Sequence, residues 1–194
     1  MTTEQESWWA GDAGKAYIAR NRLDWSLRVP FWDDVINWTN PGSVLEIGCN
    51  IGSNLKAIRS IDRELNLVGV DVNVDAITEA TIAGLNTYEM SGAEAGDMWP
   101  DSFDLVFTAG VLIHVAPEHL SSLMDSIIKA SKRYVLAIEY AADKEEHVEY
   151  RGCTDRLWRR PFGEFYRQKG LRLIDTWDAG NGFDRCTAWL LEKK

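Results

Sequence analysis

The sequence predicts an α/β fold, in which helices cover both faces of a mostly parallel sheet. The first observation is that short apolar, strand-like runs alternate with amphipathic, helix-like stretches along most of the chain. Such alternation is typical of βαβ units. The second is that the chain closes with two strand-like runs around a glycine-rich turn, which predicts an antiparallel hairpin. The third is the length of 194 residues, which suits a single domain over 1–194.

The expected elements follow from apolar spacing. Strand-like runs are expected at 44–47, 65–70, 86–90, 103–107, 134–140, 171–177 and 185–192. Helical spacing of apolar residues is expected at 53–62, 74–83, from about 117 onward, and at 161–168. Pro117 suits the first turn of the third of these helices. A polar stretch at 141–161 interrupts the pattern, and we expect it to be an insertion on the substrate side.

The first 40 residues have an unusual composition. Five of the nine Trp residues of the chain lie before residue 39. Trp is costly to bury unless its indole N–H finds a partner. The segment 1–40 is therefore interpreted as an N-terminal helical lid or pocket wall, and plain packing onto the domain is the alternative.

Charge and composition exclude several functions. The net charge of −9 disfavours a nucleic-acid partner, because phosphates would be repelled. No apolar run approaches the 18 or so residues that span a membrane, and the start lacks a signal-peptide pattern. The three Cys residues show no zinc spacing, so no metal is expected. We expect a cytoplasmic protein without a membrane partner, and the sequence leaves its oligomeric state open.

A glycine-rich turn after the first strand is the candidate cofactor site. The segment Glu46-x-Gly48-x-Asn50-x-Gly52 joins that strand to a helix, and Asp71 ends the second strand. In an open α/β sheet, ligands bind at the carboxyl ends of the strands, and an acid there commonly holds ribose hydroxyls. Asn tolerates left-handed backbone, so Asn50 can occupy such a turn. The turn lacks the G-x-G-x-x-G spacing of dinucleotide enzymes.

These residues, with Asp97 in Gly96-Asp97-Met98, resemble the nucleoside-binding set of class I S-adenosylmethionine-dependent methyltransferases. The resemblance implies a Rossmann-like fold with a seven-stranded sheet of order 3-2-1-4-5-7-6. It implies that Glu46 and Gly48 face the amino-acid half of S-adenosylmethionine and that Asp71 takes the ribose. It further implies that Asp97 meets the adenine amino group, between the apolar side chains of Val72 and Met98.

Further segments resemble a narrower group, the methylases associated with biosynthesis of pseudaminic acid and related nonulosonic acids. The matching segments are Trp9-x-Gly11-x-x-Gly14-x-x-Tyr17-x-x-Arg20-Asn21, Gly110-Val111-Leu112-Ile113-His114-Val115, Glu139-Tyr140 and Tyr150-Arg151-Gly152-x-x-Asp155-Arg156-Leu157-Trp158. This resemblance implies a small, acidic, sugar-like substrate, either a free sugar or a nucleotide sugar.

Tyr17 and Arg20 lie three residues apart, so on a helix they share one face. Arg20 is expected to clamp the cofactor carboxylate with Tyr17 beside it; a surface Arg paired with an acid is the alternative. His114, after the fourth strand, is a candidate general base, and a residue that only shapes the pocket is its alternative. Glu139 is a second candidate for orienting or deprotonating a hydroxyl or amine.

Four arginines crowd ten residues of this acidic chain, at 151, 156, 159 and 160. Guanidinium groups bind carboxylates and phosphates with two parallel hydrogen bonds. Arg151, Arg156 and Arg159 are expected to contact an acidic substrate, together with Tyr140 and with Trp158, which can stack on a sugar ring. The alternative is a solvated loop whose arginines pair with neighbouring acids.

The function expected is therefore methyl transfer from S-adenosylmethionine to an oxygen or nitrogen of a small acidic sugar, with S-adenosylhomocysteine as product. Two alternatives stay open at this point. One is an NAD-dependent oxidoreductase on a Rossmann sheet, and the other is a non-catalytic module that binds a nucleoside.

Overall fold

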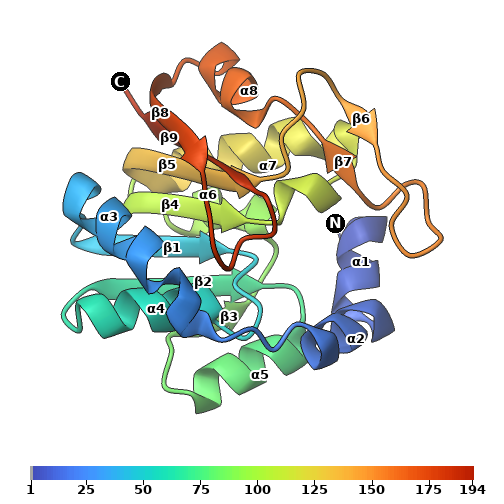
Figure 1. Cartoon of the computed structure of the whole chain (residues 1–194), viewed down its shortest axis with the longest axis horizontal. Coiled ribbons are helices and arrows are strands. Elements are labelled where there is room, and N and C mark those ends of the chain that lie inside the picture. The colour runs from blue at the N-terminus through green and yellow to red at the C-terminus, as the bar shows by residue number, and fades with distance from the viewer. Residues whose placement is uncertain (1) are drawn as a thin grey trace.

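A computed structural model describes residues 2–194 of the chain. Its central feature is a seven-stranded sheet of order β3-β2-β1-β4-β5-β9-β8 (Figure 1). The strands are β1 (Ser43–Ile47), β2 (Asn66–Asp71), β3 (Thr87–Glu89), β4 (Phe103–Ala109), β5 (Ser131–Glu139), β8 (Arg172–Asp178) and β9 (Thr187–Glu192). The first five strands pair in parallel, and β9 pairs antiparallel with both β5 and β8. This confirms the predicted sheet order and the terminal hairpin.

The buried strands show why the sheet needs a cover on both sides. Every residue of β1 is buried, and successive side chains point to opposite faces. Val44 belongs to one apolar cluster with Trp32, Leu55 and Ile58. Leu45 belongs to the other cluster, with Met124 and Ile127. The sheet is therefore the middle of three layers, and the alternation of helices between its two faces follows from the alternation of apolar side chains.

The helices divide between these faces. One face is covered by α3 (Val29–Thr39), α4 (Ser53–Ile61) and α5 (Val74–Ile82), and the other by α6 (Gly92–Met98), α7 (Pro117–Ala130) and α8 (Phe162–Gln168). As predicted, α7 begins at Pro117. None of the helices within residues 2–194 combines the length and apolar character needed to cross a lipid bilayer.

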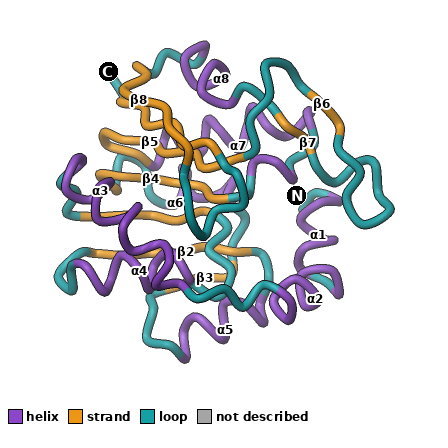
Figure 2. The backbone as a smooth tube through the Cα atoms, in the orientation of Figure 1, coloured by secondary structure: helices purple, strands orange, loops and turns teal. Residues whose placement is uncertain are grey.

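The N-terminal segment is not one lid over 1–40, as the Trp content suggested. Helix α3 is a core helix, since Trp32 is fully buried against Phe107 of β4, with ring centroids 4.4 Å apart. Only α1 (Glu4–Ala10) and α2 (Asp12–Arg20) lie outside the sheet layers, beyond the carboxyl ends of the central strands (Figures 1 and 2). A 3₁₀ turn, η1 (Trp25–Arg28), joins these two lid helices to α3.

The insertion at 141–161 contains more structure than its polar sequence suggested. Two short strands, β6 (Glu146–His147) and β7 (Trp158–Arg159), pair antiparallel. The loop between them turns toward α1 in Figure 1, so the insertion and the lid helices meet over the same edge of the sheet. We call residues 141–161 the strap.

Gly14 allows α2 to dock on the sheet edge. A Cβ added at this position would lie 1.9 Å from the carbonyl oxygen of Trp9 and 2.3 Å from Nδ2 of Asn73. The Asn73 amide itself donates to that carbonyl, at 2.8 Å. The backbone of α2 at Gly14 therefore packs so closely against Trp9 and the loop after β2 that no side chain fits between them.

Gly14→Ala is expected to lower the free energy of unfolding by about 1–3 kcal/mol through overpacking. Ala16→Ser, on the exposed side of α2, adds one heavy atom without a clash and is the matched control. Denaturant unfolding measures the change, and amide hydrogen exchange should show the loss of protection in α1 and α2. Equal stability of the two variants would contradict this account of lid docking.

Candidate active site at the carboxyl edge of the sheet

The turn after β1 has the backbone that the glycine pattern predicts. Gly48, Asn50 and Gly52 all adopt positive φ, at 73°, 49° and 76°. A Cβ at Gly48 would lie 2.4 Å from Cγ2 of Val111, so the missing side chain lets the loop after β4 approach the turn. The expectation that Asn50 tolerates left-handed backbone is confirmed.

Asp71, at the end of β2, holds this turn. Its carboxylate accepts from the backbone N–H of Asn50 at 2.8 Å and from that of Asn73 at 2.9 Å. Burial raises the pKa of Asp71, and these backbone hydrogen bonds oppose that shift. Each carboxylate oxygen accepts one of the two bonds and has further acceptor capacity for a ligand hydroxyl. Val72 follows directly and is half-buried at the same edge.

Glu46 lies inside the sheet beside the turn. Its Oε1 accepts from Nδ2 of Asn54 at 2.6 Å, whereas its buried Oε2 has no hydrogen-bond partner within residues 2–194. Burial raises the pKa of Glu46 to about 8. An unpartnered carboxylate oxygen in such a place is costly unless a donor arrives. The site is therefore suited to a ligand that brings a cationic or N–H group.

The amide of Asn54 connects Glu46 to the lid side of the site. Its Oδ1 accepts from Nη1 of Arg28 at 2.8 Å and from Nε1 of Trp32 at 3.2 Å. Arg28 also donates to the carbonyl of Gly182 in the β8–β9 loop, at 2.9 Å. Sequence analysis missed Arg28 and Asn54; the available signal was a polar residue in the first turn of the helix that follows the glycine turn.

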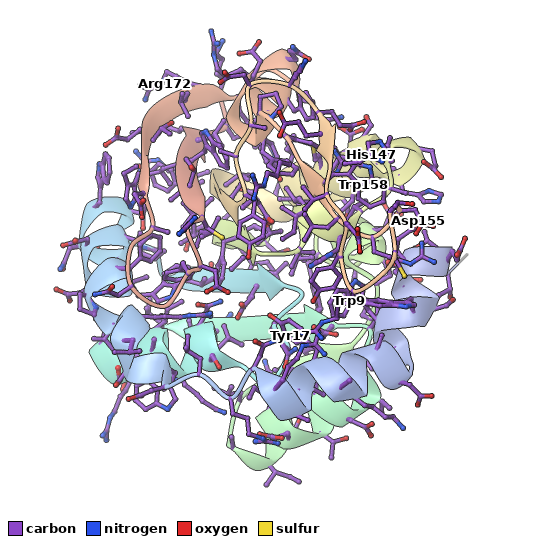
Figure 3. The ribbon with its side chains drawn as sticks, turned by 45° about the vertical axis from the view of Figure 1, so that its right-hand side comes forward. Trp9, Tyr17, His147, Asp155, Trp158 and Arg172 are labelled. Carbon is purple, nitrogen blue, oxygen red and sulfur yellow. The ribbon has the colours of Figure 1, made fainter. Side chains whose placement is uncertain are left out.

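The lid brings aromatic residues over the edge. The ring of Trp9 lies 5.3 Å from that of Tyr17, in edge-on geometry (Figure 3). It lies 4.7 Å from the ring of His114, again edge-on. Arg20 stacks over Tyr17 at 5.1 Å and donates to the hydroxyl of Tyr150 at 3.1 Å. Tyr17 and Arg20 therefore do share one side of α2, as the spacing predicts, and both face the site.

Asp97 and Met98 do not reach this edge, and their predicted contacts with adenine are corrected. Residues 92–98 form α6, whose exposed Asp97 pairs with Lys129 at 2.6 Å. Lys129 lies two residues before the start of β5, so Asp97 lies at the amino edge of the sheet. The expected position directly after β3 is instead taken by Met90, whose N–H donates to the carbonyl of Asp71 at 3.0 Å.

His114 is central to the site. It ends the 3₁₀ turn η2 (Leu112–His114), and its Nδ1 lies 2.6 Å from the carbonyl oxygen of Arg156 in the strap. The rings of Trp9 and Tyr150 pack against it, the latter at 5.2 Å. Burial lowers the pKa of His114 to about 4, so the imidazole is neutral at pH 7. A neutral ring that bonds a carbonyl through Nδ1 carries its proton there, which makes Nε2 the basic nitrogen.

Glu139 is not placed to act on a substrate, and its predicted catalytic role is corrected. Its side chain is fully buried, and its carboxylate accepts from the backbone N–H groups of Val111 at 3.2 Å, Leu112 at 3.1 Å and Ile113 at 3.4 Å. Burial raises the pKa of Glu139 to about 7. A carboxylate enclosed in this way holds the loop that carries His114.

The arginine cluster divides into buried and exposed members. Arg156 is only 8% exposed; it donates to Glu4 of α1 at 2.5 Å and to Asp155 at 2.7 Å. Trp158 is only 2% exposed, so neither its face nor the Arg156 fork is open to a substrate, which corrects both predictions. Arg151 and Arg159 are exposed. Arg151 lies over the ring of Tyr150 at 5.8 Å, beside the site, whereas Arg159 is on β7.

Tyr140 follows β5 and is half-buried. Burial, followed in effect by the nearby Cys186 and Asp184, raises the pKa of Tyr140 to about 12, and Tyr17 and Tyr150 contribute to the same shift. The structure thus gathers Tyr17, Tyr140 and Tyr150 around one region, and Tyr140 stays a predicted substrate contact.

Comparison with known proteins agrees with this geometry. Residues 45–133 match a methyltransferase domain family. No curated protein matches the chain. Among solved structures, 1,6-didemethyltoxoflavin-N1-methyltransferase of Burkholderia thailandensis is similar at a TM-score of 0.78 and 13% identity, covering 100% of this chain and 91% of its own.

Two further structures are similar. Magnesium protoporphyrin IX methyltransferase of Synechocystis has a TM-score of 0.70 and 14% identity, with 99% of this chain and 98% of that chain covered. Human N-acetylserotonin methyltransferase has a TM-score of 0.73 and 16% identity, with 100% of this chain and 60% of that chain covered. At these identities, the likeness shows the fold.

The described residues fit S-adenosylmethionine. The free Oε2 of Glu46 suits its ammonium group, the remaining lone pairs of Asp71 suit ribose hydroxyls, and the guanidinium of Arg20 suits its carboxylate. The methyltransferase domain match includes the first two of these residues. The methyltransferase domain match and the fold support an S-adenosylmethionine-dependent methyltransferase, and the described residues fit that cofactor.

Proposed function

We propose that the enzyme methylates a hydroxyl or amine of a small, acidic, sugar-like substrate in the cytoplasm, namely a nonulosonic acid of the pseudaminic type or a related nucleotide sugar. The observation that carries the proposal is the neutral, oriented imidazole of His114 beneath the lid. It supplies a base where the loop after β4 meets the cofactor turn, which is where an acceptor must lie to reach the methyl group.

His114 is proposed as the general base. As the acceptor oxygen or nitrogen bonds to the methyl carbon, Nε2 of His114 takes the proton that the acceptor loses, and the imidazole becomes cationic. The cofactor, when bound, supplies an electrophilic methyl group on a sulfonium, and the bond between sulfur and that carbon breaks. Trp9 and Tyr150 enclose the ring and exclude water, which fixes the approach of the acceptor.

Exposed cations beside the site support an acidic substrate. Arg20 and Arg151 both contact Tyr150, one through its hydroxyl and one over its ring. Because the guanidinium of Arg20 is assigned to the cofactor carboxylate, Arg151 is the cation that offers a local attraction for a substrate carboxylate in this chain of net charge −9. Because Arg156 and Trp158 are engaged inside the strap, we now propose Arg151 and Tyr140 as the substrate contacts from this region.

Asp71→Asn is expected to weaken S-adenosylmethionine binding by about 1–3 kcal/mol, because charged hydrogen bonds to the ribose and to the turn are lost. Asp97→Asn is the matched control, since Asp97 lies at the opposite edge of the sheet. Isothermal titration calorimetry measures both affinities. A larger loss in the Asp97 variant, or none in the Asp71 variant, would remove Asp71 from the cofactor site.

His114→Asn is expected to lower kcat about 10²–10⁴-fold while cofactor affinity stays unchanged, because only proton transfer loses its base. His147→Asn, at an exposed position of the strap, is the control and should leave kcat at the wild-type value. Wild-type kcat in the His114 variant would show that alignment alone drives the reaction.

The substrate class is tested by mass spectrometry. Pseudaminic acid and its nucleotide-activated form are each incubated with enzyme and isotope-labelled S-adenosylmethionine, and one of them should gain a labelled methyl group. Arg151→Gln should then raise KM about tenfold for that acid, the loss of roughly one charged hydrogen bond. Arg167→Gln, on α8, should not. Absence of labelled product with both compounds would contradict the proposed substrate class without touching the methyltransferase assignment.

A further inference from the structure

The turn that carries His114 is short and has few hydrogen bonds of its own. Helix η2 is a three-residue 3₁₀ turn, in which the His114 N–H donates to the Val111 carbonyl at 2.9 Å and the Val115 N–H donates to the Leu112 carbonyl at 3.3 Å. Short 3₁₀ turns have poor hydrogen-bond geometry, and both ends leave backbone groups without partners. The orientation of the imidazole therefore depends on groups outside the turn.

Two buried side chains of opposite charge supply those partners. Glu139 accepts from the three N–H groups at the start of the turn. At the other end, Nη1 of Arg160 donates to the carbonyl of Leu112 at 3.0 Å and to that of Val115 at 2.9 Å. Glu139 thus binds backbone donors of the turn and Arg160 binds backbone acceptors of the same turn, which carries His114.

Arg160 belongs to the strap, and two other strap residues hold its guanidinium in place. Its Nε donates to Oε2 of Glu145 at 2.6 Å, and its guanidinium lies 4.9 Å from the ring centroid of Trp158. The same strap provides the Arg156 carbonyl that bonds Nδ1 of His114. Arg160 therefore sets the distance between the backbone of the turn and the strap that orients the imidazole.

Stability alone does not explain this residue. Arg160 is fully buried, and its Nη2 has no hydrogen-bond partner within residues 2–194. Burying a guanidinium is costly, and apolar side chains often replace buried ion pairs without loss of stability. A buried guanidinium with an unused donor indicates that its placement serves the geometry of the turn.

We propose that Arg160 is a positioning residue for methyl transfer, which holds the 111–116 turn against the strap so that His114 keeps its proton on Nδ1 and presents Nε2 to the acceptor. This inference rests on the proposed role of His114. It assigns no contact with substrate or cofactor to Arg160 itself.

The first test reads the imidazole directly. In enzyme with ¹⁵N-labelled histidine, long-range ¹H–¹⁵N spectra of wild type should show His114 as a single neutral tautomer protonated at Nδ1. Arg160→Lys keeps the charge but replaces the planar fork with a point charge, so the turn should loosen and the spectra should show mixed tautomers. Arg167→Lys, at an exposed position of α8, should keep the wild-type signal.

The second test separates kcat from binding. With the acceptor that the labelling experiment identifies, Arg160→Lys should lower kcat at least about tenfold, since small misplacements of a reacting group slow a reaction steeply. Its KM and its affinity for S-adenosylmethionine should stay within about twofold of wild type because Arg160 lies outside both binding sites. Arg167→Lys should change none of these values.

Specific results would overturn the inference. One is a single Nδ1-protonated tautomer in folded Arg160→Lys enzyme, whatever its kcat. If that variant does not fold, Glu145→Gln provides the test, because it removes only the ion pair that holds the Arg160 guanidinium within the strap. An unchanged tautomer and an unchanged kcat in Glu145→Gln would also overturn the inference. The NMR measurement of the tautomer needs no substrate. An error in the proposed function would appear as wild-type kcat in His114→Asn, whereas an error in this inference would appear as an unchanged tautomer in Arg160→Lys.

Discussion

Carboxylates at strand ends hold the loops of neighbouring strands, and the active edge of this enzyme depends on that arrangement. Asp71 ends β2 but holds the turn that follows β1. Glu139 ends β5 but holds the turn that follows β4. Parallel strands finish at one edge, so the N–H groups of each loop lie beside the end of the next strand. A carboxylate there satisfies donors that the sheet cannot pair.

Burial shifts the pKa values of Glu46, Glu139 and His114, all at this edge, in different directions. Glu46 and Glu139 bind protons more tightly in the folded chain, with pKa values of about 8 and about 7, than in the unfolded chain. Their contribution to stability is complete below a pH of about 4 and is lost as the pH rises through those values. His114, with a pKa of about 4, acts oppositely: between about pH 6.5 and 4, the unfolded chain takes up the proton first, so stability falls as the pH falls.

Patterns local in sequence predicted the sheet, the hairpin and the cofactor turn. The positions of Asn50 and Asp71 could be predicted because a left-handed turn and the end of a buried strand each favour a few residue types. Asp97 was misplaced because Gly92 and Gly96 make α6 a poor helix by propensity. A Cβ at Gly96 would lie 2.6 Å from the carbonyl oxygen of Ser126, so packing of α6 on α7 requires the glycine that weakens the helix signal.

The roles of the charged residues were harder to predict, because burial is a property of the whole fold. Arg151 and Arg156 are alike in sequence, yet one is exposed and the other closes on Glu4, 152 residues away along the chain. The sequence around Glu139 does not indicate that its hydrogen-bond partners are backbone N–H groups. Arg28 and Asn54 were missed for the same reason. Their hydrogen bonds form only when the lid, α4 and the terminal hairpin come together in the fold.

The bond between Nδ1 of His114 and the strap ends on a main-chain oxygen. A main-chain acceptor persists through almost any change of side chain, so a substitution at Arg156 keeps the acceptor of the His114 Nδ1 proton. What must be kept is the path and length of the strap. For the base proposed above, such a construction separates the orientation of the imidazole from the identity of the side chain at the residue that supplies its acceptor.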